Sequence, residues 1–346
     1  MKILIIKFCI ILIIVFGYHL AFAEGNDNKN GTTAAQFLKV GAGARPMALG
    51  GAFVALSNDV YSLYWNPAGI TKINRFSIGG SYTRWFADIT HHFWGIVLPI
   101  TQSTSVGLSG IFVSMDPIEI TTVDQQHGTG QFFEASDLAI GISAAVRPID
   151  FLSIGMSGKI IQQSLYNESA STFAFDVGSL LDIPFRGMKL GMNFSNFGGD
   201  LKLDGRDLIR EYDLNPDNTL NTGVETRLRT QGWNLPVNFR VGLAIDLIGK
   251  GTEGLLENEN NRITLAVDGN HPSDAAQYLN IGAEYNFSEI ISFRGGFRSN
   301  RDVEKFFYGL GLSIPLADKS SFYFDYALAS FGELDYIHIF GAGISL

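Results

Sequence analysis

Two arginines four residues apart are the side chains of this sequence best suited to binding an anion. Arg294 and Arg298 fall in a segment of alternating polar and apolar residues, so they would share one face of a β-strand. A guanidinium group can bind a carboxylate through two parallel hydrogen bonds. Glu284 and Asp325 are expected on the polar face of other alternating segments, and these four residues are our candidate ligand-binding set.

Further charged residues of both signs occur at equivalent positions of other segments. They are Lys159, Asp176, Arg240, Asp246, Arg262 and Asp268. For most of the charged set we favour a charge network that lines the inside of the fold and holds a neighbouring segment in place. The alternative is a polar path for a ligand.

The histidines give no support for a metal site or a hydrolase. His91 and His92 are adjacent, so in a strand they point to opposite faces and cannot bind one metal ion together. His127 and His271 fall in expected loops, and His338 lies on an apolar face. None has a serine or carboxylate at a spacing diagnostic of catalysis. We therefore predict no catalytic residue, no metal and no cofactor.

The elements that must position these side chains are strands, because period-two alternation dominates from about residue 74 onward. The clearest example is the segment 321–330, whose two faces are Phe322, Phe324, Tyr326 and Leu328 against Tyr323, Asp325, Ala327 and Ala329. In water this pattern means one buried and one wet face. In a bilayer it means lipid outside and a polar lumen inside.

About fourteen such segments follow one another, each of about the ten to twelve residues that a tilted strand needs to cross a bilayer. An even number returns both ends of a barrel to the same side. We predict an all-β, transmembrane antiparallel barrel rather than a soluble β-sandwich, which would rarely sustain so many long strands. The expected spans are 74–86, 91–101, 104–115, 132–147, 150–165, 171–182, 187–195, 233–248, 261–270, 276–287, 289–299, 305–315, 319–330 and 335–346.

The expected connections alternate in length, as short periplasmic turns and long external loops do in outer-membrane barrels. Short turns are expected at 101–103, 148–150, 184–186, near Ser288 and at 317–319, and long loops at 116–131 and 196–231. The connection 249–260 departs from the pattern, because it is long for a periplasmic turn.

The composition and the first residues agree with export to a membrane. The chain is 46% hydrophobic and only 17% charged, and its net charge of −9 argues against a nucleic-acid partner. Residues 1–23 are predicted to be a secretory signal peptide, with Lys2 and Lys7 before an apolar run and an A-x-A cleavage site before Glu24. The alternative, a membrane anchor, is disfavoured by the polar run that follows. The single cysteine, Cys9, lies in the part removed.

A stretch rich in glycine and small residues, 41–70, precedes the first strand. Small residues let backbones approach closely, so this stretch can lie inside the barrel. Ser57 or Asn58 is expected to cap a short helix that ends before Pro67. We predict an N-terminal plug with short helices over residues 24–72, followed by a barrel over 73–346. The residues of its motif are Gly50, Gly51, Asn66, Pro67, Ala68 and Gly69.

The run LGGAFVALSNDVYSLYWNPAGI in this stretch resembles the N-terminal signature of the PorV/PorQ family. That family belongs to a larger group of outer-membrane barrels typified by the long-chain fatty acid transporter FadL. Asn66-Pro67-Ala68 matches the NPA element of the FadL plug. The motif match is confined to this stretch, and the rest of the chain is similar in strand pattern alone.

The resemblance implies a non-enzymatic outer-membrane protein of a Gram-negative-type bacterium, linked to the type IX secretion system and acting at the cell surface on exported substrates. The alternative is a FadL-like channel for fatty acids or other hydrophobic compounds, and an outer-membrane enzyme is a distant third. The partners implied are outer-membrane lipid, secretion-system subunits or hydrophobic small molecules.

The last segment also implies a partner. Alternating residues up to the chain end resemble the signal that the barrel assembly machinery reads, although the final residue is Leu346 rather than an aromatic one. These residues are Tyr336, His338, Phe340, Ala342, Ile344 and Leu346.

Overall fold

The computed structural model describes residues 31–346, apart from 186, 214–222, 251–255, 302 and 317–319. The predicted signal peptide and the predicted turn at 317–319 lie outside the described residues. Among the described residues, no helix is long and apolar enough to cross a membrane.

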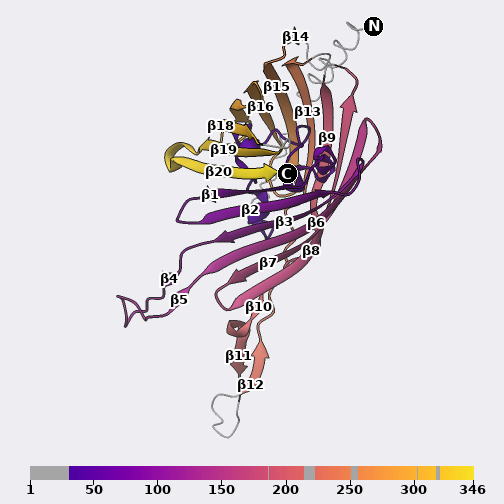
Figure 1. Ribbon diagram of the computed structural model, residues 1–346. Coiled ribbons are helices and arrows are strands. Elements are labelled where there is room, and N and C mark those ends of the chain that lie inside the picture. The colour runs from indigo at the N-terminus through magenta and orange to yellow at the C-terminus, as the bar shows by residue number, and fades with distance from the viewer. Residues whose placement is uncertain (1–30, 186, 214–222, 251–255, 302, 317–319) are drawn as a thin grey trace.

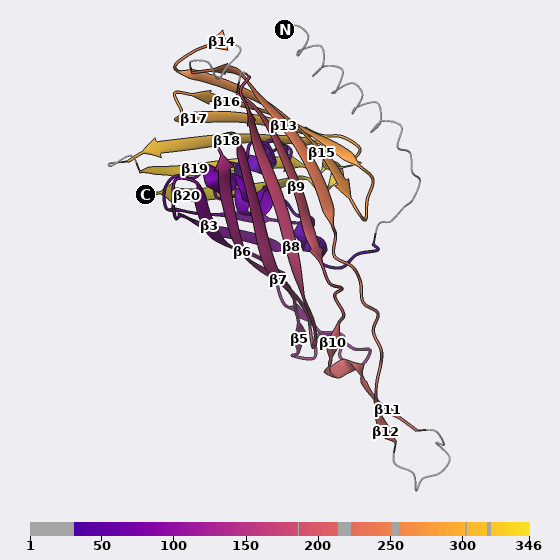
Figure 2. The ribbon, with the colours of Figure 1, turned by 90° about the vertical axis from the view of Figure 1, so that its right-hand side faces the viewer.

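Fourteen strands of the described chain pair in an antiparallel ring (Figures 1 and 2). The ring closes where the first strand pairs with the last, Ser77 lying opposite Ser345. The strands are β1 (Ser77–Arg84), β2 (Thr90–Pro99), β3 (Thr104–Ser114), β6 (Ala135–Ile149), β7 (Leu152–Leu165), β8 (Glu168–Ile183), β9 (Met188–Gly198), β13 (Asn238–Gly249), β15 (Asn261–Pro272), β16 (Tyr278–Phe287), β17 (Ile291–Arg298), β18 (Phe306–Pro315), β19 (Ser321–Ser330) and β20 (Tyr336–Ser345).

The predicted barrel is therefore confirmed, and each expected span overlaps one strand. The largest difference is at β13, which begins at Asn238 instead of residue 233. Pro236 explains the late start, because proline has no amide hydrogen to donate to a ladder.

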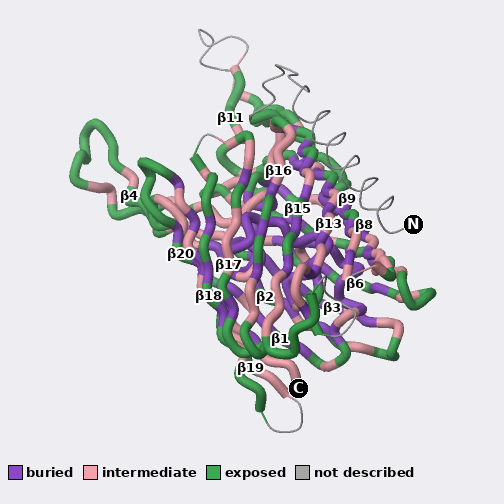
Figure 3. The backbone as a smooth tube through the Cα atoms, turned by 90° about the horizontal axis from the view of Figure 1, so that it is seen from above, coloured by how far each residue is buried: buried purple, intermediate pink, exposed green. Residues whose placement is uncertain are grey.

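Exposure alternates along the strands as the sequence predicts (Figure 3). In β19, Phe322 and Phe324 are exposed on the outside of the barrel, whereas Asp325 and Ala327 are buried on the inside. The wall thus has an apolar outer face and an inner face that accepts charge.

The two ends of the barrel differ in their connections. One end, here called the loop end, carries the hairpin of β4 (Ile118–Glu119) and β5 (Phe132–Phe133) and a long extension. The extension projects away from the wall in Figures 1 and 2. Its elements are β10 (Asp204–Gly205), η3 (Arg206–Leu208), β11 (Ile209–Tyr212) and β12 (Val224–Arg227). A shorter 3-10 turn, η6 (Gly332–Leu334), joins β19 to β20 at the same end.

The opposite end, here called the turn end, has the short connections and the C-terminus. By strand order, β13 ends and β15 begins there, so the number of residues between them is large for this end, as the sequence suggested; residues 251–255 lie outside the described residues. Between these strands, β14 (Leu256–Glu257) pairs in parallel with the end of β13. Because long loops are external in outer-membrane barrels, the loop end is the extracellular one.

A plug segment (residues 35–73) occupies the interior of the barrel. It contains η1 (Gln36–Lys39), α2 (Ala44–Ala48), α3 (Ser62–Trp65) and η2 (Pro67–Lys72). The chain enters at the loop end, where the Ala34 amide donates to the Asn234 carbonyl. It reaches the turn end, where Lys72 is ion-paired with Asp182 of β8.

Glycines on the inner wall explain how so much chain fits inside. A Cβ added at any of nine glycines, each on a different strand, would crowd or overlap plug atoms. At Gly155, Gly191 and Gly296 the atoms overlapped belong to the plug backbone. Wall and plug backbones are therefore in direct contact. The nine are Gly95, Gly107, Gly155, Gly178, Gly191, Gly282, Gly296, Gly309 and Gly341.

Candidate functional site

Asn66 joins two parts of the plug to the wall. Its side chain is fully buried, and Nδ2 donates to the carbonyls of Val54 in the plug and Ser179 in β8, both at 3.0 Å. Oδ1 accepts from the Ala68 amide at 3.2 Å, so Asn66 also caps η2, with Pro67 in its first position. The extended backbone of Asn66 ends α3, as the proline predicts.

The start of α3 differs from the sequence expectation. Neither Ser57 nor Asn58 caps it. The carboxylate of Asp59 instead accepts from the Tyr61 amide at 2.9 Å. Ser57 turns back to the Phe53 carbonyl, and a Cβ on Gly69 would overlap Ser57.

Gly50 and Gly51 form a left-handed turn that rests against β17. Their φ angles are +66° and +84°, which favour glycine. The Gly50 carbonyl accepts from Nε and Nη2 of Arg298 at 3.3 and 3.1 Å. The remaining guanidinium nitrogen of Arg298 pairs with Glu304 at 2.7 Å. Arg298 therefore holds the plug turn against the wall.

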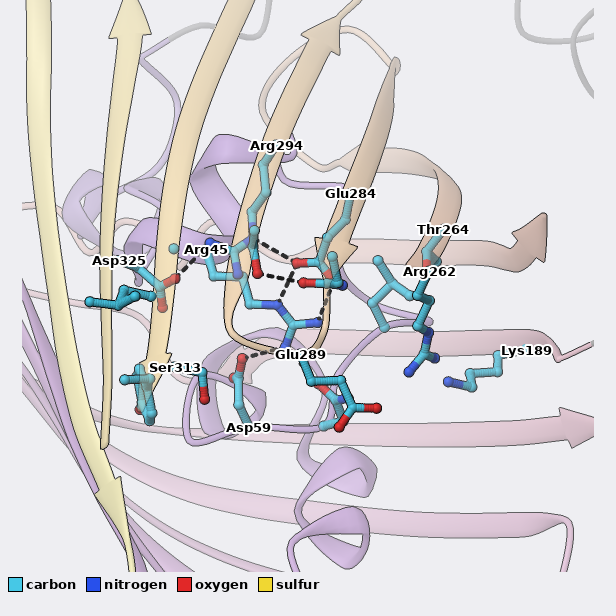
Figure 4. Close-up of a pocket in the computed structure, with 17 residues that line it drawn as sticks. Arg45, Asp59, Lys189, Arg262, Thr264, Glu284, Glu289, Arg294, Ser313 and Asp325 are labelled. Atoms are coloured by element: carbon cyan, nitrogen blue, oxygen red, sulfur yellow. Dashed lines mark hydrogen bonds and ion pairs between the residues drawn. The ribbon is translucent and has the colours of Figure 1, made fainter. Parts of the chain in front are cut away.

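Five charged side chains make a second attachment nearer the turn end (Figure 4), here called the turn-end cluster: Arg45, Asp59, Glu284, Arg294 and Asp325. Arg45 of the plug pairs with Glu284 of β16 at 2.9 Å and with Asp59 at 2.8 Å. Arg294 of β17 pairs with Glu284 and with Asp325 of β19, each at 2.6 Å. The cluster borders a cavity of about 230 Å³.

Burial and the neighbouring charges shift the pKa values of the two plug members of this cluster, Arg45 and Asp59, in opposite directions. Burial alone would lower the pKa of Arg45, but Glu284 and Asp59 raise it well above its ordinary value. Burial raises the pKa of Asp59 above its usual range, even though Arg45 acts to lower it. Arg45 therefore keeps its proton.

Most of the remaining interior charges form local pairs or hold the plug. Asp268 accepts from the Phe53 and Val54 amides, each at 2.8 Å. Lys159 pairs with Asp176 at 2.8 Å, and Arg262 with Asp246 at 2.9 Å. This agrees with the charge network we favoured from the sequence. All four candidate ligand-binding residues are engaged with the plug, with each other or, at Arg298, with Glu304.

Sequence reasoning missed Arg45 and Asp59. They are the two charged residues within 41–70, and a charge in this otherwise uncharged stretch was the sequence signal that could have identified them. Sequence reasoning also did not distinguish Arg240 from the other interior charges. Arg240 lies at the loop end, where no carboxylate among the described residues is within ion-pair distance of it. No group of three or more potential metal ligands gathers among the described residues.

A closed antiparallel barrel with a short helical segment inside it has the fold of FadL-type outer-membrane channels. The toluene transporter TbuX of Ralstonia pickettii matches with a TM-score of 0.55 and 14% identity, over 88% of this chain and 97% of that one. The CymD monoaromatic hydrocarbon channel gives 0.54 and 11%, over 88% and 97%. A FadL homologue of Pseudomonas aeruginosa gives 0.52 and 11%, also over 88% and 97%. At these identities the likeness is one of fold.

The family of this chain is shown by a match of its sequence to a family model. The model of the family described as type IX secretion system protein PorV matches residues 23–271, and the chain belongs to this family. It is an outer-membrane barrel protein of a Gram-negative-type bacterium, associated with type IX secretion. The resemblance drawn from the plug motif is thereby confirmed. No curated protein matches the chain.

Proposed function

We propose that this chain acts at the cell surface on proteins exported by the type IX system, without enzymatic chemistry and without passing solute through its own lumen. The packing of the plug carries this proposal. Wall glycines on nine strands meet plug atoms, and the turn-end cluster ties plug to wall. With the lumen occupied, the long connections at the loop end are the surface available to an exported protein.

A photo-crosslinking experiment tests this role. A photoreactive residue at Val224 of β12, which is 67% exposed, should crosslink to an exported protein or another secretion subunit in secreting cells. The same residue at Phe293, on the outer wall of β17, is the control. An equal product pattern at the two positions would overturn the proposal.

Closure of the lumen is tested separately. Vesicles holding the purified full-length protein should be no more permeable to small sugars than empty vesicles. Permeability that rises with protein content would mean that the plug does not close the lumen.

A FadL-like channel for fatty acids or other hydrophobic compounds is the second candidate, and the shared fold over 88% of the chain favours it. In that case Arg294, Arg298, Glu284 and Asp325 would line the ligand path. Vesicles containing the protein would then take up labelled fatty acid faster than empty vesicles. No acceleration would leave the secretion role as the better proposal.

The segment boundaries and the remaining partners belong to the same proposal. We infer a signal peptide over 1–23, a plug over 24–72 and a barrel over 73–346, with outer-membrane lipid around the barrel and assembly by the barrel assembly machinery. Mass spectrometry of the purified protein should give an N-terminus at Glu24. Heating should change its mobility on a gel, as closed barrels unfold only when heated.

A further inference from the structure

One arginine, Arg84 of β1, faces outward from the wall of the barrel. Exposed and buried positions alternate along β1, and Arg84 shares the exposed face with Ile78 and Tyr82. Every other lysine, arginine, aspartate and glutamate in the described part of the fourteen wall strands falls on an inward position of its strand, as Asp325 does in β19. The outer wall therefore carries a single permanent charge.

Arg84 lies at the extracellular border of this wall. It is the last residue of β1, at the loop end, and it pairs across the sheet with His338 of β20 and Thr90 of β2. His338 is also exposed, and side chains directly opposite in an antiparallel pair have Cβ atoms about 5 Å apart. The next outward row toward the membrane is aromatic: Tyr326, Phe340, Tyr82, His92 and Phe112. A charged row above an aromatic row is typical of the membrane–water interface, where an outward arginine is tolerated.

Arg84 and His338 present hydrogen-bond donors at this border. The pair of Arg84 with Asp88 spans 3.4 Å, and the two side chains are 69% and 67% exposed, so this contact contributes little. His338 is held by Tyr326, whose hydroxyl lies 2.7 Å from Nδ1. With the tyrosine donating to Nδ1, the other ring nitrogen, Nε2, carries the proton and can donate outward.

The wall below Arg84 offers an apolar surface with small residues at its centre. Two rows deeper, Gly80 of β1 lies opposite Ala342 of β20. The same row continues to Trp94 on one side and Phe324 on the other, which are 38% and 43% exposed. Small side chains at this place let an acyl chain pack against the strand backbone. This surface favours a lipid over a soluble anion.

We propose that Arg84 and His338 bind the phosphate of an anionic lipid of the outer leaflet, whose acyl chains lie against the wall below. The planar guanidinium matches two phosphate oxygens, and Nε2 of His338 donates to another. The site is more specific than the lipid surroundings inferred above, because it selects a phosphate at one place on the barrel. It lies outside the lumen and is independent of the secretion role.

Native mass spectrometry of the purified full-length protein in detergent micelles tests the site. Dioleoyl phosphatidic acid is the probe, and dioleoylglycerol is its match, since it keeps the acyl chains and lacks the phosphate. We expect about tenfold tighter binding of phosphatidic acid, because hydrogen bonds to charged groups are lost with the phosphate. Inorganic phosphate at an equal concentration should not displace phosphatidic acid.

Arg84→Gln should weaken the binding of phosphatidic acid about tenfold and leave that of dioleoylglycerol unchanged. Arg227→Gln is the control, because Arg227 is an exposed arginine of the loop-end extension, paired with Asp204. It should bind both lipids like the unmodified protein. His338→Gln should cause a smaller loss for phosphatidic acid alone. The comparison uses assembled, heat-modifiable barrels.

Three outcomes would overturn the proposal. The first is equal affinity for phosphatidic acid and dioleoylglycerol. The second is equal affinity of Arg84→Gln and Arg227→Gln for phosphatidic acid. The third is displacement of phosphatidic acid by an equal concentration of inorganic phosphate, which would assign the site to soluble phosphate. If Arg84→Gln does not assemble, Arg84→Lys keeps the charge without the planar fork, and its binding as tightly as the unmodified protein would count against the site.

Discussion

The two ends of the plug use arginine in opposite ways. At the turn end, Arg45 and Arg294 share Glu284 and each has a second carboxylate partner. At the loop end, Arg240 is more deeply buried than Arg45 and has aromatic rings as neighbours, with no carboxylate within ion-pair distance among the described residues. The difference indicates that arginines with carboxylate partners fasten the plug to the wall through ion pairs, whereas Arg240 contacts the plug through ring faces. Four predictions test this contrast.

Glu284→Gln should have the largest effect. The amide cannot neutralise Arg45 and Arg294, and breaking a buried ion pair from one side costs about 3–5 kcal/mol. The wall strands keep their own hydrogen bonds, so the barrel should remain closed while the plug loosens. Limited proteolysis should then cut within residues 45–64 much faster than in the unmodified protein.

Glu289→Gln is the matched control for this change. Glu289 borders the same cavity but is exposed, and its pair with Lys250 is exposed as well. Such pairs contribute about 0–1 kcal/mol. Equal proteolysis of the two variants would mean that the turn-end cluster does not fasten the plug.

Phe324→Arg separates damage to the wall from damage to the plug. Phe324 is 43% exposed on the outside of β19, one residue before Asp325 of the cluster. An arginine facing lipid costs about 2–4 kcal/mol at the bilayer midplane and less near the interfaces. The yield of assembled, heat-modifiable barrel should fall, while barrels that do assemble should protect the plug normally.

Phe324→Leu keeps the position apolar and should assemble well. Normal assembly of Phe324→Arg would argue that protein rather than lipid covers this face. Plug proteolysis in assembled Phe324→Arg barrels as fast as in Glu284→Gln would mean that the two regions are coupled through β19.

Asn66→Ala should have an intermediate effect on the plug. It removes hydrogen bonds to Val54, Ser179 and Ala68 in a fully buried place, where an unmatched polar group costs about 1–3 kcal/mol. Proteolysis within 55–64 should accelerate, but less than in Glu284→Gln. Pro67→Ala keeps those bonds and should be milder, at about 0.4–1 kcal/mol. A larger effect of Pro67→Ala than of Asn66→Ala would mean that the restricted backbone of Pro67, rather than the hydrogen bonds of Asn66, holds the plug.

The sequence predicted the wall well because the necessary signal is local. Alternation within a single segment assigns Phe324 to the outside and Asp325 to the inside without knowledge of any other strand. The end of α3 was equally predictable, since Pro67 alone prevents the helix from continuing. Each of these conclusions needs only a few consecutive residues.

The attachments of the plug were not predictable in this way. Arg45 and Glu284 are 239 residues apart, and nothing in the sequence near either one indicates the other. The wall glycines were visible, but their frequency in most strands hid the fact that Gly155 and Gly296 face plug backbone. Arg294 and Arg298 drew attention as free anion binders. The contact of Arg240 with the rings of Tyr64 and Trp65 could be recognised only from the packing.

The smallest effect is expected where the plug segment enters the barrel at the loop end. Thr33, Gln36 and Lys39 all donate to Asp274, whose side chain is 1% exposed. Burial alone would raise the pKa of Asp274, but these hydrogen bonds and the charge of Lys39 hold it below its usual value. The contribution to stability is therefore fully present above the unfolded-state pKa of about 3.9, and it is lost as pH falls through the lower folded-state pKa.

Hydrogen exchange followed by mass spectrometry can measure this loss. Protection of residues 34–40 should decline as pH falls below about 3.9, after correction for the intrinsic exchange rate, while protection of η2 at the turn end stays constant. Asp274→Asn cannot form the ion pair with Lys39, so its protection of 34–40 should already be lower at neutral pH and should change less on acidification. Asp204→Asn, at an exposed loop-end pair, should behave like the unmodified protein. If Asp274→Asn kept full protection at neutral pH, the plug would be held at the turn end alone. The two ends would then differ in whether they hold the plug, as well as in the partners of their arginines.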